Sequence, residues 1–153
     1  MYEVNITTKN DKVNDEIGFR TIETDGSKIL LNGSEIFLKG ISIHEEAPYD
    51  LGRVTSKEQC QILLQWAKEL GCNFVRLAHY PHNETMVKEA EKMGFLIWSE
   101  VPVYWSVAFE NPETLENATM QLEDMISRDK NRAGVILWSV ANETKEGEAR
   151  NIF

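Results

Sequence analysis

The spacing of apolar residues changes along the chain, and each spacing predicts a different kind of element. At the start, apolar and polar residues alternate, so Tyr2, Val4 and Ile6 share one face of an expected strand. The polar stretch 9–15 predicts a turn region. The first fifteen residues therefore predict one strand that runs into a turn.

A hairpin is the next expected element. The dipeptide Asn32-Gly33 lies between the largely apolar runs 28–31 and 35–38. Asparagine and glycine tolerate the positive φ angles that a two-residue hairpin turn requires. These residues therefore predict two antiparallel strands joined at Asn32-Gly33.

From residue 37 onward, apolar runs typical of buried strands alternate with helical patterns. The expected strands cover residues 37–43, 74–78, 95–98 and 134–140. The expected helices begin at a Thr55–Glu58 capping box, at an Asn83 cap and at Asn111-Pro112, and a last helix covers 146–153. In the first of them, the residues expected to face the core are Ile62, Leu63, Trp66, Ala67 and Leu70.

Buried strands that alternate with amphipathic helices predict an α/β fold with a parallel sheet covered by helices. Four such strands fit an open sheet or part of a (β/α)8 barrel. The sequence contains no Gly-rich phosphate-binding turn between a strand and a helix, which argues against a nucleotide-binding sheet.

Composition narrows the classes of partner. The 153 residues carry a net charge of −9, whereas nucleic acid and anionic membrane surfaces bind basic patches. We therefore expect neither as a partner.

No apolar run is long enough to span a membrane, and Met1 is followed by a strand pattern instead of a signal peptide, so we expect a cytoplasmic protein. Cys60 and Cys72 are expected to be buried free thiols.

Polar and aromatic side chains follow each of the four expected strands. Because the carboxyl ends of parallel strands meet at one edge of the sheet, these residues are expected to form one site. All three histidines of the chain are among them. The candidates are His44, Glu45 and Glu46, then His79, Tyr80 and His82, then Glu100, Tyr104 and Trp105, and finally Asn142 and Glu143. Arg76, within a strand, is expected to point into the barrel and pair with a buried carboxylate.

Other kinds of site fit the residues less well. Taken alone, a histidine after a strand is more often a hydrogen-bonded structural residue than a catalyst, and a glutamate there is often a helix cap or a solvated loop charge. A metal-dependent barrel hydrolase usually carries His-x-His on an early strand, and only His44 is present here. No Gly-x-Ser-x-Gly nucleophile turn occurs. We therefore expect no metal and no cofactor.

Two motifs are specific: Arg76-x-x-His79-Tyr80-Pro81 and Trp138-Ser139-x-x-Asn142-Glu143. Together with residues 18–20, the 32–33 turn and segments 39–45, 97–100 and 127–131, they resemble the catalytic domain of glycoside hydrolase family 2, which includes β-galactosidases and β-glucuronidases. The resemblance implies that residues 21–153 form the first half of a catalytic (β/α)8 barrel. It also implies that residues 1–20 end a preceding β-sandwich domain.

The resemblance also implies roles for individual residues. Glu143 matches the general acid/base, and Asn142 matches the residue that binds the sugar 2-hydroxyl. His44 and His79 match residues that line the substrate pocket, and Glu100 and Trp105 are expected in or just behind it. A partly apolar setting would raise the pKa of an acid such as Glu143, and Trp105 and Trp138 are candidates to provide it.

In this family the nucleophile follows the seventh barrel strand, and this chain shows four. We therefore expect the isolated chain to be inactive and to associate with itself or with the missing barrel half. The sugar stays open between galactose and glucuronic acid, with mannose behind them. The competing interpretation is a half-barrel that binds sugar or a partner chain without turnover.

Overall fold

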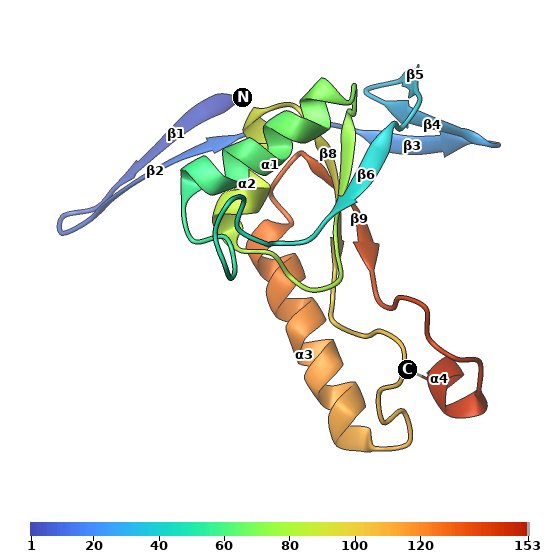
Figure 1. Ribbon diagram of the computed structural model, residues 1–153. Coiled ribbons are helices and arrows are strands. Elements are labelled where there is room, and N and C mark those ends of the chain that lie inside the picture. The colour runs from blue at the N-terminus through green and yellow to red at the C-terminus, as the bar shows by residue number, and fades with distance from the viewer. Residues whose placement is uncertain (153) are drawn as a thin grey trace.

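A computed structural model describes residues 1–152 of the protein. It contains three separate sheets and four helices, in the chain order shown in Figure 1. The elements are β1 (Tyr2–Thr7), β2 (Lys12–Ile17), β3 (Ile22–Asp25), β4 (Lys28–Leu31), β5 (Ser34–Ile36), β6 (Gly40–Ile43), α1 (Lys57–Glu69), β7 (Phe74–Leu77), α2 (Glu84–Lys92), β8 (Leu96–Glu100), α3 (Pro112–Asp129), β9 (Val135–Ser139) and α4 (Glu148–Ile152).

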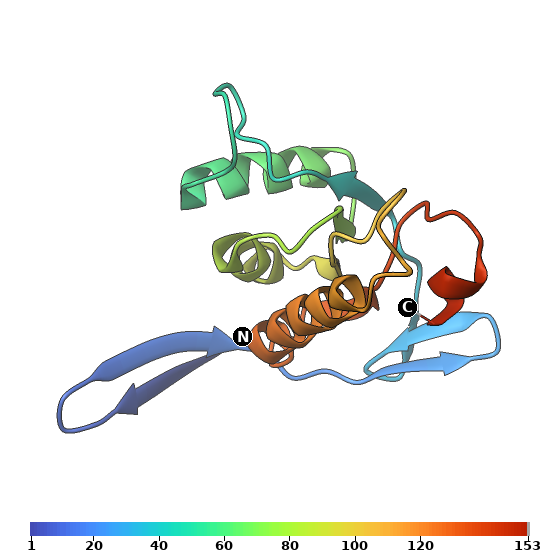
Figure 2. The ribbon, with the colours of Figure 1, turned by 90° about the horizontal axis from the view of Figure 1, so that it is seen from below.

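The central sheet is parallel, and its strand order β6-β7-β8-β9 follows the chain. Helices α1, α2 and α3 lie next to one another on one side of these strands, as Figure 2 shows. A doubly wound sheet would reverse its strand order and carry helices on both faces. Sequential order with helices on one face is the arrangement of a (β/α)8 barrel, so the structure confirms the α/β class and the partial barrel.

The core lies between this sheet and the helices. Every second residue of β7 and β8 faces the helices, so Val75, Leu77 and Ile97 are buried. The helices contribute Cys60, Leu64 and Ala67 from α1 and Met86, Val87 and Ala90 from α2. Cys60 and Cys72 are both buried and free, as expected.

Helix α1 differs from its expected form in two ways. Its capping box is formed by Ser56 and Gln59, one position after the expected Thr55–Glu58 pair. Its core face carries Cys60, Leu64 and Ala67, whereas Trp66 is 40% exposed and Leu70 is also exposed. The helix carries two overlapping apolar stripes, and the one with the smaller side chains fits against the sheet.

Two antiparallel sheets precede the parallel one. The three-stranded sheet β3-β4-β5 includes the expected Asn32-Gly33 turn and lies at the amino-terminal end of the parallel strands (Figure 1). The hairpin β1-β2 projects away from the body. Its second strand begins at Lys12, inside the region expected to be a turn, because cross-strand pairing with β1 organises polar residues that show no pattern of their own.

The parallel sheet also leaves one face open. Arg76 and Trp98 pair across β7 and β8 on the face opposite the helices, with the guanidinium carbon 4.6 Å from the centre of the indole ring. Leu137, beside Trp98 on β9, is 41% exposed. Among residues 1–152, no helix is both long and apolar enough to cross a membrane.

Candidate active site at the carboxyl ends of the parallel strands

A hollow of about 390 Å³ lies where the four parallel strands end. Residues that follow each strand line it, which confirms that the strand-end residues converge. The lining residues are His44, Glu46, His79, Tyr80, Tyr104, Trp105, Asn142 and Glu143.

Glu143 and Trp105 meet at the rim of this pocket. The loops after β8 and β9 are joined by backbone hydrogen bonds from Trp105 N to Asn142 O, 3.2 Å, and from Asn142 N to Val103 O, 2.8 Å. The indole Nε1–H of Trp105 donates to Oε2 of Glu143 at 2.9 Å. Trp105 and Glu143 both have left-handed backbones, with φ of 55° and 49°. This conformation is energetically unfavourable for residues other than glycine, and residues that adopt it are frequent at functional sites.

A buried ionic network contacts two of the residues that line the pocket, His79 and Asn142. Glu100 is fully buried and accepts hydrogen bonds from Arg76 Nε at 2.7 Å and from His79 Nδ1 at 2.6 Å. Arg76 also donates through Nη2 to Oδ1 of Asn142 at 2.7 Å. The pairing of Arg76 with a buried carboxylate is thus confirmed. Glu100 does not line the pocket itself. It holds Arg76 and the pocket residue His79 in place.

This network decides how Asn142 faces the pocket. Since its amide oxygen accepts from Arg76, the amide NH₂ group is the part left to donate to a ligand. That orientation follows from the hydrogen bond to Arg76, because amide oxygen and nitrogen are assigned from their partners. Asn142 therefore presents a donor beside the Glu143 carboxyl.

Four rings form a continuous row along the pocket. The ring centres of His44 and His79 are 5.2 Å apart, those of His79 and Tyr104 6.2 Å, and those of Tyr104 and Trp105 5.6 Å. Such spacings and tilts are favourable for aromatic pairs. The row begins after β6 and ends beside Glu143.

Three candidate residues lie elsewhere. Glu45 is buried, pairs with Arg53 and accepts a hydrogen bond from the backbone of Asn83, so it organises a loop. His82 is buried and bonds to a backbone carbonyl through Nε2, and burial lowers its pKa. Trp138 packs against both hydrophobic clusters and is not among the residues that line the pocket.

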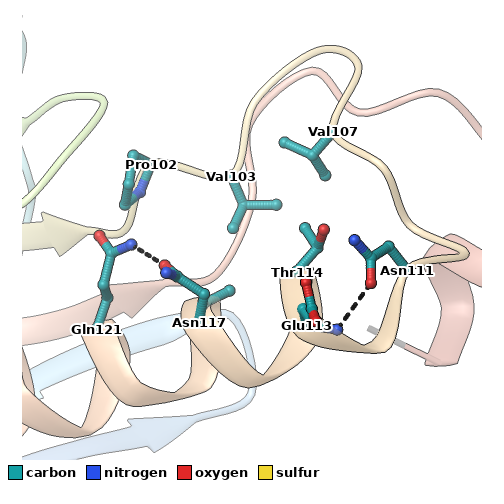
Figure 3. A pocket seen from close by; sticks show the side chains of 9 residues that line it. Pro102, Val103, Val107, Asn111, Glu113, Thr114, Asn117 and Gln121 are labelled. Atoms are coloured by element: carbon teal, nitrogen blue, oxygen red, sulfur yellow. Dashed lines mark hydrogen bonds between the residues drawn. The ribbon is translucent and has the colours of Figure 1, made fainter.

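A second hollow, of about 340 Å³, lies outside the barrel between the loop after β8 and the start of α3 (Figure 3). Asn111 lines it, but its side-chain oxygen is used to cap α3 by accepting from Glu113 N at 3.0 Å. Asn117 and Gln121 bond to each other across one turn of the helix. These polar groups serve the helix, so this hollow is not the candidate site. Within residues 1–152, no group of three or more histidine, cysteine, aspartate or glutamate side chains could hold a metal ion.

Comparison with known proteins identifies the family. The family described as "Glycosyl hydrolases family 2, TIM barrel domain" matches residues 22–152. This chain belongs to glycoside hydrolase family 2. The expected acid/base, Glu143, therefore lies at the carboxyl end of the fourth strand of a family 2 barrel, in a pocket that the same strands form.

The relatives include β-glucuronidases and β-galactosidases. A putative β-glucuronidase of Formosa agariphila is 36% identical over 87% of this chain and 16% of its own length. A β-galactosidase of Thermoanaerobacterium thermosulfurigenes is 29% identical over 97% of this chain and 21% of its own. A solved β-glucuronidase of Ruminococcus gnavus in complex with D-glucuronic acid is 37% identical, with a TM-score of 0.81 over 94% of this chain and 25% of that one. This chain thus spans a quarter or less of these relatives.

Part of the site is not evident from the sequence alone. Arg76 was expected to find a carboxylate, but its second bond to Asn142 joins residues 66 positions apart. Tyr80, Tyr104 and Glu46 were recognised as strand-end residues and assigned no role, yet they line the pocket. Their position directly after strands was the available signal.

Proposed function

We propose that Glu143 is the general acid/base of a retaining β-glycosidase and that this chain supplies the first half of the catalytic barrel. The observation that carries the proposal is the placement of Glu143 at the end of β9. There it lines the pocket beside Asn142 and accepts a hydrogen bond from Trp105. A carboxyl at the pocket rim is accessible both to a glycosidic oxygen and to water, as an acid/base must be.

The chemistry assigns Glu143 two steps. It first protonates the glycosidic oxygen, which is otherwise a poor leaving group, and it then removes a proton from the water that releases the sugar. As the protonated glycosidic bond breaks, a second carboxylate, about 5–5.5 Å away in retaining enzymes, attacks the anomeric carbon and forms a glycosyl-enzyme intermediate, and the water later displaces this carboxylate. Glu100 is unsuited to that attack because Arg76 and His79 hold its two oxygens. We propose that the nucleophile comes from a later barrel strand.

The other pocket residues bind and position the sugar in this proposal. Asn142 donates through its amide NH₂ to the 2-hydroxyl, and Arg76 holds the amide in that orientation. His44 and His79 contact the glycone, and Glu100 acts through His79 and Arg76 as a positioning residue. Trp105 holds the acid/base carboxyl.

The names of the relatives support a β-glucuronide as the first candidate substrate. The R. gnavus structure was solved with D-glucuronic acid, and the F. agariphila relative is a putative β-glucuronidase. A β-galactoside is the second candidate, because the T. thermosulfurigenes β-galactosidase aligns with 97% of this chain.

A chimera tests both the mechanism and the sugar. This chain would replace the matching segment of the R. gnavus β-glucuronidase, and hydrolysis of nitrophenyl β-glucuronide and β-galactoside would be measured. We expect the chimera to prefer the glucuronide and Glu143→Gln to lower kcat about 10³-fold, as general acid catalysis accounts for about 10²–10⁴-fold. Glu146→Gln, three residues further along, is the matched control and should retain activity.

The result can exclude the proposal. If the Glu143→Gln chimera keeps its activity, Glu143 is not the acid/base. If the chimera folds and binds glucuronate but never hydrolyses it, the chain is a sugar-binding module. The isolated chain, assayed beside it, is expected to be inactive.

A further inference from the structure

The position of Trp105 indicates which part of a substrate this residue contacts. Following the proposed function, Glu143 protonates the oxygen that joins the sugar to its leaving group, so its carboxyl lies at that bond. The indole Nε1 of Trp105 is 2.9 Å from Oε2 of this carboxyl. His44 and His79, which contact the sugar in that proposal, lie at the opposite end of the ring row from Trp105. The leaving group is thus brought against Trp105.

Trp105 offers an open aromatic surface there. Its side chain is 63% exposed although it lines a pocket, and the neighbouring Tyr104 is 38% exposed. The two rings meet edge to face at 5.6 Å. An exposed tryptophan beside a reacting group leaves apolar area that a ligand can cover.

This surface is held in place before any ligand arrives. Three constraints act on Trp105: the backbone bond to Asn142, the indole bond to Glu143 and the ring contact with Tyr104. Its backbone is left-handed, with a φ of 55°, and the residue lines the pocket. A surface that is already ordered loses little entropy on binding, which favours selective contacts.

The chemistry of the surface indicates what it selects. The inner end of the ring row consists of His44 and His79, which can hydrogen-bond to sugar hydroxyls. At the outer end, the indole N–H is already used by Glu143, so the rings mainly offer their faces. We propose that Trp105, with Tyr104 beside it, forms the leaving-group subsite and selects flat aromatic aglycones. Flat rings stack on such faces, whereas small alkyl groups cover little of them.

Ligand titrations of the full chain test this proposal. The indole N–H signals of Trp66, Trp98, Trp105 and Trp138 would be followed by ¹⁵N–¹H spectroscopy, with Trp105 assigned from Trp105→Phe. We expect nitrophenyl β-glucuronide to shift the Trp105 signal and to bind about tenfold more tightly than methyl β-glucuronide. In Trp105→Ala the two dissociation constants should become nearly equal.

Two further variants define the outcomes. Trp66→Ala, on the outer side of α1, should leave the tenfold ratio unchanged. Trp105→Phe should keep most of it, since stacking and not the indole hydrogen bond creates the preference. An unchanged ratio in Trp105→Ala overturns the proposal, and so does an equal weakening of both ligands. Either result would leave the role of Glu143 intact, because that role is decided by Glu143→Gln in the chimera.

Discussion

Glu100 shows how a single side chain organises the site. It has no exposure to solvent, yet it carries a carboxylate that bonds to both Arg76 and His79. A buried charge is tolerated only when its partners replace the lost water. By holding Arg76, Glu100 also orients Asn142, so one buried residue determines how a donor faces the pocket.

We predict that Glu100→Gln destabilises the protein by about 3 kcal/mol, because removing one charge of a buried pair leaves the other uncompensated. Urea unfolding monitored by circular dichroism would measure the loss. Glu123→Gln, on an exposed position of α3, is the matched control and should change the free energy of unfolding by no more than about 0.5 kcal/mol. A Glu100→Gln variant as stable as that control would show that the network contributes little to folding.

At the scale of elements, the hairpin β1-β2 is fastened to the barrel by Arg132. This arginine lies in the turn between α3 and β9, is almost fully buried, and pairs with Asp15 through both nitrogens of its guanidinium end. It also donates to the backbone carbonyl of Glu16 at 2.8 Å, and Lys92 of α2 pairs with the Glu16 carboxylate. We propose that residues 1–20 end a preceding β domain and that this clamp sets its position against the barrel.

The clamp is expected to open in acid. The hydrogen bond from Arg132 holds the pKa of Asp15 below its ordinary value of 3.8. A carboxyl whose pKa is depressed on folding contributes stability that is present above its unfolded pKa and is lost as the pH falls through the folded one. Protection of the β2 amides against hydrogen exchange should therefore stay constant down to about pH 4 and decline below it.

Asp15→Asn tests the clamp directly. This variant should show reduced β2 protection already at neutral pH and little further loss in acid. Asp11→Asn, in the exposed turn of the same hairpin, should behave like the unsubstituted chain. If Asp15→Asn keeps full protection at pH 7, other contacts hold the hairpin.

At the scale of the whole molecule, β6 and β9 are the edge strands of the parallel sheet, and α1, α2 and α3 cover only one of its faces. Leu137 is partly exposed on the other face, and Val140 just after β9 is exposed. Unpaired strand edges and exposed apolar faces favour association. We propose that the isolated chain associates with itself through this face.

Light scattering at micromolar concentration would measure the mass of the isolated chain, which we expect to exceed that of a monomer. Leu137→Glu should restore a monomer, because a charge on the open face opposes its burial. Met120→Glu, on the exposed side of α3, should leave the mass unchanged. A monomer without any substitution would contradict the proposal.

Local signals in the sequence predicted the elements well where the hydrogen bonds are local. Asn83 caps α2 and Asn111 caps α3, as expected, because a cap joins residues two or three positions apart. The box that caps α1 lies one residue later than the sequence predicts, because adjacent Thr55 and Ser56 can both cap a helix and only the packing of the helix selects Ser56. The residues of β2 show no strand pattern of their own, and pairing with β1 makes them a strand.

By itself, the sequence determined the α/β class, the order of the parallel strands and of the helices between them, the family motifs and the gathering of strand-end residues at one edge. These follow from periodicity and from the rule that parallel strands end on the same side. Only the tertiary structure decided which of those residues line the pocket and which support it. Glu45, His82 and Glu100 are buried and do not line it, whereas Trp105 and Glu143 do, because burial and hydrogen bonding depend on contacts between segments far apart in the chain.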